Sequence, residues 1–292
     1  MKNQRNKALL SLILSMSIFG TIGIVRKYVA LPSSVIALGR ALIGTIFLAL
    51  LMILRRQPFS VSAVRKQALP LLLSGCFLGF NWILLFEAYC YTPVATATLC
   101  YYLAPVIVIL AASLLFRETL TVKKALCALA AVIGAVLVSG ILTGGSGSSD
   151  GKGVLLGLGA AVLYASVVLL NKGIRDVPAM DRTLVQLAVS AIVLIPYVLL
   201  TEDMPQLSPG ALDLALLLLA GILHTGIAYA LYFGSIHALS AQTAALFSYI
   251  DPVLAILLSA LLLREPFGIC SIFGAVLILG AAFLSEYEPK KA

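Results

Sequence analysis

The sequence predicts an all-α membrane protein of ten transmembrane helices, arranged as a 5+5 inverted-topology repeat with both termini in the cytoplasm. Three observations predict this fold: the composition, ten apolar segments of bilayer length, and a polar motif that occurs twice. Of the 292 residues, 61% are hydrophobic and 11% are charged, and the mean hydropathy is +1.09. Soluble domains contain about 45–50% apolar and about 25% charged residues, so the bilayer is the expected solvent.

The ten apolar segments are each about 18–23 residues long, which is the length that a bilayer core requires. Because lipid offers no hydrogen bonds to the backbone, each segment is expected to be a helix. The first is expected to be an uncleaved span rather than a signal peptide, because many more spans follow it. The expected spans are 8–29, 33–54, 68–90, 94–115, 124–142, 153–172, 183–200, 212–234, 240–262 and 267–285.

Lysine and arginine placement predicts the orientation, since cytoplasmic loops carry an excess of positive charge. With the N-terminus inside, the outer side holds only Arg26, Lys27, Lys152 and Arg264, while Arg40 lies within a span. The remaining basic residues are cytoplasmic: Lys2, Arg5, Lys7, Arg55, Arg56, Arg65, Lys66, Arg117, Lys123, Lys124, Lys172, Arg175, Arg182, Lys290 and Lys291. The net charge of +8 is therefore an orientation signal and does not indicate a nucleic-acid partner.

A Tyr-x-x-Pro motif followed by Arg-Glu occurs twice at a constant offset. Tyr102-Leu-Ala-Pro105 recurs 147 positions later as Tyr249-Ile-Asp-Pro252, and Arg117-Glu118 recurs at the same offset as Arg264-Glu265. Phe19 and Lys27 match Tyr164 and Lys172 at an offset of 145. Rare polar residues that keep a constant offset indicate an internal repeat.

The predicted units are residues 1–142 and 153–292, joined by a flexible extracytoplasmic Gly/Ser linker at 143–152. Each unit holds an odd number of spans, so the second enters the membrane upside down. Inverted repeats are the architecture of many secondary transporters, with the substrate site near the midplane between the repeats.

The chain resembles the EamA family of the drug/metabolite transporter superfamily over nearly its whole length. The ten helices, the 5+5 repeat and the proline followed by Arg-Glu at the end of the fourth helix of each half carry the resemblance, above all in Ala88–Tyr91–Pro105–Glu118 and its counterpart. The resemblance implies transport of a small organic molecule. Family members move amino acids, other metabolites, quaternary amines or toxic compounds, and the motifs do not choose among them.

Residues present in both halves are expected to form the scaffold or its moving parts. Pro105 and Pro252 each remove one backbone hydrogen bond and are expected to kink or hinge their helices. The charged residues near span ends are expected to snorkel or to pair at helix ends, with a gate as the alternative. They are Lys27, Lys172, Arg117, Glu118, Arg264 and Glu265.

Polar residues that break the repeat are better candidates for a substrate or coupling site, because the other half folds without them. They are Arg40, Asn81, Glu87, His224 and Asp251. Asp251 is about 11 residues into its span, roughly 16 Å at 1.5 Å per residue. This depth near the midplane makes it the first candidate for a proton or cation site, or else a fixed salt-bridge partner of Arg40.

The other candidates have two readings each. Glu87 is expected in an outer vestibule or at a solvated helix end, with a coupling site as the alternative. His224 is expected to be a buried neutral histidine bonded to a neighbouring helix, or a proton relay. The aromatic candidates either pack or hold a cationic or aromatic ligand with their ring faces: Trp82, Tyr101, Tyr102, Tyr164, Tyr229 and Tyr249.

Two glycine pairs have the spacing that lets transmembrane helices approach closely: Gly75 with Gly79, and Gly153 with Gly157. They are expected to pack helices within the monomer, with a dimer face as the alternative. The chain is therefore expected to be a monomer or a homodimer.

The sequence thus predicts a multi-pass secondary transporter of the cell membrane, moving an amino acid, amine or similar zwitterion or cation by alternating access. No Walker motif is present, so protons, sodium ions or the substrate's own gradient would supply the energy. The expected partners are the substrate and the lipid bilayer, with no cofactor or metal, since the five cysteines form no CxxC pair. The competing classes are a facilitative channel or exchanger without ion coupling and an intramembrane enzyme, for which no HExxH or comparable motif is present.

Overall fold

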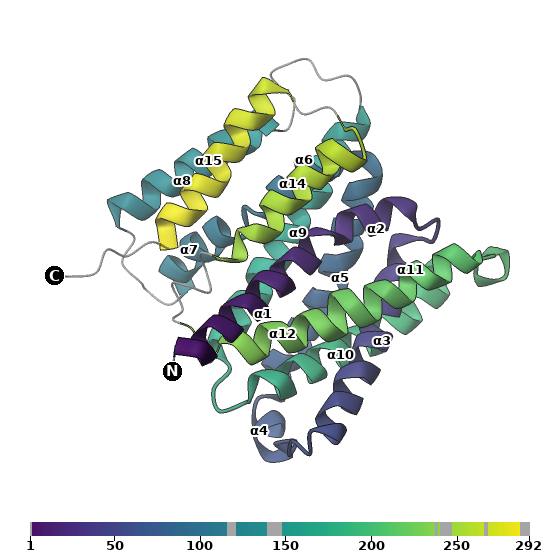
Figure 1. Ribbon diagram of the computed structural model, residues 1–292. Helices are drawn as coiled ribbons and strands as arrows, with labels where there is room; N and C mark the ends of the chain where they lie inside the picture. The colour runs from purple at the N-terminus through teal and green to yellow at the C-terminus, as the bar shows by residue number, and fades with distance from the viewer. Residues whose placement is uncertain are drawn as a thin grey trace.

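The computed structural model describes residues 2–115, 121–138, 148–236, 239, 247–265 and 268–286. Within these ranges all regular secondary structure is helical, and no strand occurs (Figure 1). The prediction of an all-α protein is therefore confirmed. Seven apolar helical segments are long enough to cross a membrane, and three shorter ones lie in α8, α14 and α15.

The helices follow the apolar segments of the sequence, with two short additions, α4 and η2, in connections. Their bounds are α1 Lys2–Gly20, α2 Ile22–Tyr28, α3 Ser33–Leu54, α4 Val61–Lys66, α5 Ala68–Tyr91, α6 Val94–Tyr101, α7 Ala104–Leu115, α8 Val122–Val138, α9 Ser148–Gly173, α10 Ala179–Thr201, η2 Met204–Gln206, α11 Ala211–Gly221, η3 Ile222–Ile227, α12 Ala228–Ile236, α14 Ile250–Leu262 and α15 Ile269–Glu286.

The proline motifs break their helices rather than kinking them. The segment that contains Pro105 stops at Tyr101 and restarts at Ala104, and α14 starts directly after a turn at Tyr249. Pro105 and Pro252 therefore each lie in the first turn of the following helix, where a missing N–H breaks no intrahelical hydrogen bond. The predicted kink or hinge thus takes the form of a helix break just before each proline.

A second irregularity lies between α11 and α12, where η3 is one turn of π-helix. Two side chains in this wider turn form hydrogen bonds with backbone carbonyls five residues earlier in the chain. The Thr225 hydroxyl donates to the carbonyl of Ala220 at 3.1 Å, and His224 Nδ1 lies 3.4 Å from the carbonyl oxygen of Leu219. Such turns inside α-helices frequently mark functional sites.

The helices pack in pairs that join early and late parts of the chain. In Figure 1, α8 lies beside α15, and α3 crosses α10 on the other side of the molecule. α5 packs along α9 as α1 packs along α12, and α5 packs on α10 as α11 packs on α3. α9 also contacts α6 and α7, while α1 contacts α14.

Glycines allow the closest of these approaches. A Cβ atom at Gly75 in α5 would lie 2.6 Å from the Cβ of Val189 and 2.9 Å from the backbone oxygen of Gln186, both in α10. In the same way, Gly221 in α11 lies against Ile43 in α3. The glycine spacing at Gly75 thus packs helices within this chain.

We expect Gly75→Ala to lower the unfolding temperature in detergent, because α5 and α10 would have to separate. Overpacking of this kind costs about 1–3 kcal/mol. Gly234→Ala in α12 is the matched control, since its added Cβ meets nothing within 4 Å among the described residues. Differential scanning fluorimetry compares the two. Equal unfolding temperatures would show that the α5–α10 contact tolerates the methyl group.

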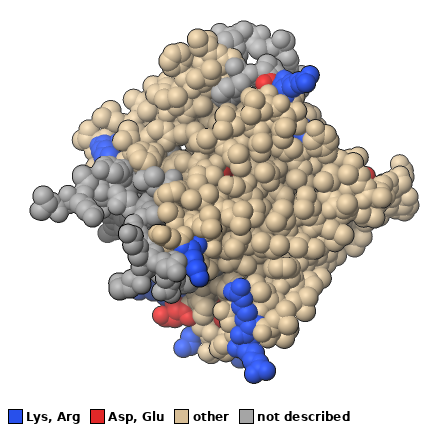
Figure 2. Space-filling view, viewed as in Figure 1, with Lys and Arg blue, Asp and Glu red and all other residues tan. Residues whose placement is uncertain are grey.

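The outer surface is that of a membrane protein. Large apolar side chains along the helices are widely exposed, among them Leu54 at 81%, Leu114 at 82% and Leu200 at 86%. On the face shown in Figure 2, most of the visible lysine and arginine lies toward the edges, and the broad area between them is largely uncharged. An apolar surface of this extent matches lipid rather than water.

Candidate functional site

A cavity of about 530 Å³ lies between helices from early and late parts of the chain. This volume is within the usual range for small-molecule sites, about 300–1,000 Å³. The cavity is lined by Phe19, Ile22, Arg40, Leu78, Trp82, Leu85, Tyr89, Thr98, Tyr101, Tyr102, Ala104, Pro105, Val108, Ile109, Tyr164, Val168, Tyr229, Ser248, Tyr249 and Asp251. Among the residues that the structure describes, Arg40 and Asp251 are the two charged ones that line it.

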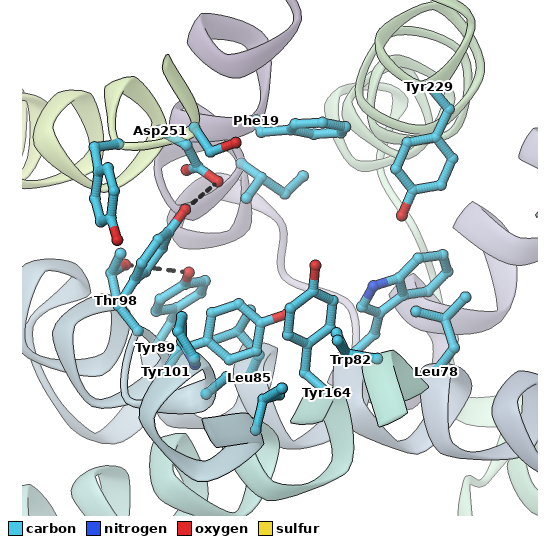
Figure 3. A pocket seen from close by; sticks show the side chains of 18 of the residues that line it. Phe19, Leu78, Trp82, Leu85, Tyr89, Thr98, Tyr101, Tyr164, Tyr229 and Asp251 are labelled. Atoms are coloured by element: carbon cyan, nitrogen blue, oxygen red, sulfur yellow. Dashed lines mark hydrogen bonds between the residues drawn. The ribbon is translucent and has the colours of Figure 1, made fainter. Parts of the chain in front are cut away.

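Asp251 supplies the negative side of the cavity. It lies in the first turn of α14, where the partial positive charge of the helix N-terminus favours a carboxylate. The hydroxyl of Tyr102, from the break between α6 and α7, donates a hydrogen bond to Asp251 Oδ2 at 2.9 Å. The two helix breaks thus place a carboxylate and its donor against each other at the cavity wall (Figure 3).

Arg40 supplies the positive side. Its side chain comes from α3 and is only 5% exposed. The guanidinium carbon lies 4.3 Å from the centre of the Trp82 ring and 5.2 Å from that of Phe86. Its Nε donates to the hydroxyl of Thr225, in the π-turn η3, at 3.1 Å. A planar guanidinium is well suited to stack on aromatic rings in this way.

The two charges do not pair with each other. Among the described residues, the one ion pair joins Lys27 to Glu265, so the predicted alternative of a fixed salt bridge between Arg40 and Asp251 is not formed. In Figure 3, Asp251 lies across the open space from Trp82, the ring on which Arg40 stacks. The cavity therefore presents a cation and an anion at separate places.

Aromatic side chains form much of the wall between them. The ring centres of Tyr101 and Tyr164 lie 5.4 Å apart, as do those of Phe19 and Tyr229. The hydroxyls of Tyr89 and Thr98 lie 3.3 Å apart and share a hydrogen bond. Figure 3 shows these rings around the open space, with the hydroxyl of Tyr229 directed into it.

Three predicted candidates do not line the cavity. Asn81 is fully buried and donates from Nδ2 to the backbone oxygen of Ala160 at 2.6 Å, which ties α5 to α9. It directly precedes Trp82, and neighbouring residues on a helix point about 100° apart. Asn81 therefore turns toward α9 while Trp82 turns toward the cavity.

Glu87 and His224 also bond to neighbouring helices. Glu87 Oε2 accepts a hydrogen bond from the hydroxyl of Ser33, the first residue of α3, at 2.6 Å. His224 is 1% exposed, and its Nε2 lies 2.8 Å from the hydroxyl of Thr21, between α1 and α2. Both side chains are thus held by hydrogen bonds between separate segments of the fold and take no part in the cavity lining described above.

The span-end residues meet at one junction. Glu265 Oε1 lies 2.9 Å from Lys27 Nζ, while its Oε2 accepts bonds from the N–H of Val94 at 2.8 Å and the hydroxyl of Ser259 at 2.5 Å. We call Lys27, Val94, Ser259 and Glu265 the Glu265 junction. It ties the end of α2, the start of α6 and the segment after α14 together.

The remaining span-end predictions are placed as follows. Arg264 is exposed and has a left-handed backbone with φ of 52°, directly before Glu265. Lys172 is exposed in the last turn of α9. Arg117 and Glu118 lie outside the described residues.

Several lining residues are not among the predicted site residues, and one signal in the sequence identifies some of them. Leu78, Trp82, Leu85 and Tyr89 lie at helical spacing in α5 and form one stripe along the cavity. Extending that stripe from Trp82 would have identified Tyr89. No comparable pattern points to Ser248, which lies outside any long described helix.

Comparison with known proteins gives consistent matches over nearly the whole chain. The model of the EamA-like transporter family matches twice, at residues 6–140 and 151–287. The Bacillus subtilis protein named "Uncharacterized transporter YxxF" is 33% identical over 284 residues, covering 94% of this chain and 89% of that protein. "Protein PecM" of Dickeya dadantii is 28% identical over 217 residues, covering 72% of this chain and 70% of its own length.

A solved crystal structure shares the fold. It superposes with a TM-score of 0.66 at 21% sequence identity, and the match covers 95% of this chain and 96% of the other. At this level of identity the likeness concerns the fold alone.

Proposed function

The chain belongs to the EamA-like transporter family and is a multi-pass transporter of the cell membrane, and from this premise we propose that it carries a small organic zwitterion or cation by alternating access, driven by a proton or sodium gradient. The observation that carries the proposal is the central cavity. Side chains from both halves line it, and its described lining includes one buried cation, Arg40, and one carboxylate, Asp251. Ionisable groups inside a membrane span are costly and mark substrate or ion pathways.

Alternating access needs two halves that can move against each other. The double match of the family model supports two repeats, and so does the packing. Gly75 lies against Val189, and Gly221 lies against Ile43. Gly221 is 146 positions after Gly75, and Val189 is 146 positions after Ile43. In each contact a glycine of one half packs against an aliphatic residue of the other half. A two-fold axis between inverted repeats predicts such a pair of equivalent contacts.

The proposed topology has ten crossings. The seven long spans and the three shorter apolar helices support this number, and an even number leaves both termini on one side. In the orientation predicted from the basic residues, the linker at 143–152 and the Glu265 junction lie on the extracytoplasmic side.

Uptake into proteoliposomes tests the transporter proposal. We expect saturable accumulation of at least one compound from a panel of amino acids, amines and metabolites, and we expect it to disappear when the ion gradient is dissipated. Flux that rises linearly with concentration would instead indicate a channel. Saturable flux that never exceeds equilibrium would indicate a carrier without ion coupling. Absence of flux for every compound would contradict the proposal.

A further inference from the structure

We infer that Arg40, stacked on Trp82 and fixed by Thr225, is an anion-binding residue of the cavity, and that the solute is a zwitterion whose carboxylate binds Arg40 while its ammonium binds Asp251. The inference deepens the proposed transport function and rests on it. It separates zwitterions from simple cations, between which the family and the sequence motifs do not decide.

The first step concerns the nitrogen atoms of Arg40. Nε is occupied by Thr225, whereas neither η nitrogen has a hydrogen-bond partner among the described residues. In the same part of the chain, the side-chain nitrogen and oxygen atoms that are both fully buried and unpartnered are Arg26 Nε and Asn81 Oδ1. The η nitrogens of Arg40 are therefore not sealed off, and they open onto the cavity that Arg40 lines.

The second step concerns charge. A buried cation without a counter-ion is unfavourable, and an ionic partner offsets that penalty. The protein supplies aromatic faces but no carboxylate to Arg40 among the described residues. A guanidinium fork with free η nitrogens matches the two oxygens of a carboxylate. A solute carboxylate would complete this site.

The third step concerns the other end of the solute. Asp251 lies across the cavity, and from the described residues it receives one hydrogen bond, at Oδ2 from Tyr102. A carboxylate has room for further donors, and an ammonium group supplies them. Because the two charged lining residues have opposite signs, a solute with one charge of each sign complements both. The rings of Tyr101, Tyr164 and Tyr229 line the space between, which suits an apolar solute body.

The position of the Arg40 guanidinium is also fixed before a solute binds. The Arg40 guanidinium carbon lies over the Trp82 ring. Thr225, in the π-turn, is held by the hydrogen bond that its hydroxyl donates to the backbone carbonyl of Ala220 in α11. The contacts with Trp82 and Phe86 and the hydrogen bond from Nε to Thr225 therefore hold the guanidinium at the cavity wall. A binding group held in place before the solute arrives loses less entropy on binding.

The chain carries its own reporter for this site, because Trp82 is its single tryptophan. The experiment therefore follows tryptophan fluorescence of the full chain, purified in detergent, during titration with the standard amino acids. For the best binder, two analogues are added: the methyl ester, which keeps only the ammonium, and the deaminated acid, which keeps only the carboxylate. Each analogue is expected to bind roughly 10- to 100-fold more weakly, which is the scale of one lost charge-assisted interaction.

Two variants assign the ends of the solute. Arg40→Gln is expected to weaken binding of the amino acid by the same factor and to leave the methyl ester unaffected. Asp251→Asn is expected to weaken the amino acid and to leave the deaminated acid unaffected. Arg55→Gln, at the exposed end of α3, is the control and should bind like the parent protein. The three-ligand comparison uses the parent protein alone, so it stands even where a variant folds poorly.

Two outcomes overturn the inference: a methyl ester that binds as tightly as its amino acid, or no fluorescence response to any amino acid at millimolar concentration. Proteoliposome flux separates this from the proposed function. Zwitterion binding without flux overturns transport and leaves the site assignment in place. Zwitterion flux at subsaturating concentration that is unchanged in Arg40→Gln overturns the site assignment and leaves transport in place.

Discussion

Asp251→Asn is expected to reduce gradient-driven accumulation to the level of protein-free liposomes while exchange at saturating solute continues. The amide can still accept the hydrogen bond that Tyr102 donates to Asp251 at 2.9 Å, so the wall of the cavity should persist. It cannot take up a proton or balance the charge of a cation. The site would therefore still load and unload solute but could no longer link that cycle to an ion gradient.

The measurement compares net uptake with counterflow in the same proteoliposomes. Asp203→Asn is the matched control, because Asp203 is exposed outside the spans next to η2, and it should leave both activities unchanged. If Asp251→Asn accumulates solute as the parent does, the coupling group lies elsewhere. If counterflow is lost together with uptake, Asp251 serves the transport cycle as a whole rather than coupling alone.

Glu265→Ala is expected to be far more damaging than Lys27→Met, although the two side chains form one ion pair. Glu265 accepts three interactions, from Lys27, Val94 and Ser259. At about 1 kcal/mol or more for each bond to a charged group, their loss amounts to roughly 3 kcal/mol. Lys27→Met removes only the ion pair. The Lys27 side chain is 29% exposed, and such a partly exposed pair contributes about 1 kcal/mol or less to stability.

Unfolding temperature and solute flux both report on this difference. Glu265→Ala should lower the unfolding temperature and slow flux, because α2, α6 and the segment after α14 would no longer be tied together. Lys27→Met should change either quantity only slightly. Equal effects of the two substitutions would show that the ion pair, and not the bonds to Val94 and Ser259, holds the Glu265 junction.

The sequence predicted the positions of the helices well because lipid leaves the chain few choices. Continuous apolar segments must be helical, and α3, for example, runs over the expected residues 33–54. The breaks were harder to predict. The sequence predicts a kink or a hinge at Pro105, whereas in the structure one helix stops at Tyr101 and the next begins at Ala104. Pro105 therefore lies in a first helical turn, where no intrahelical hydrogen bond needs its N–H.

The candidate site was predicted in part, and the failures share a cause. The criterion for a candidate is a polar residue that occurs in only one of the two repeats. This criterion identifies unusual residues but gives no information on the direction in which each side chain points. Arg40 and Asp251 line the cavity, whereas Asn81, one residue before Trp82, bonds to α9. Tyr102 is an aromatic candidate for packing or ligand binding from the sequence, but its spacing gives no sign that its hydroxyl is the hydrogen-bond donor to Asp251.

The π-turn η3 has a consequence for the history of the protein. Gly75 matches Gly221 at an offset of 146, but Gly79 matches Gly226 at 147, so the second copy holds one more residue between its two glycines. η3, Ile222–Ile227, lies there, and no such turn interrupts α5. A π-turn absorbs one added residue without rotating the rest of the helix. A difference of one codon between the two copies would thus leave Gly221 against α3 and Tyr229 beside the cavity, while the π-turn of the second copy supplies Thr225 to Arg40 of the first.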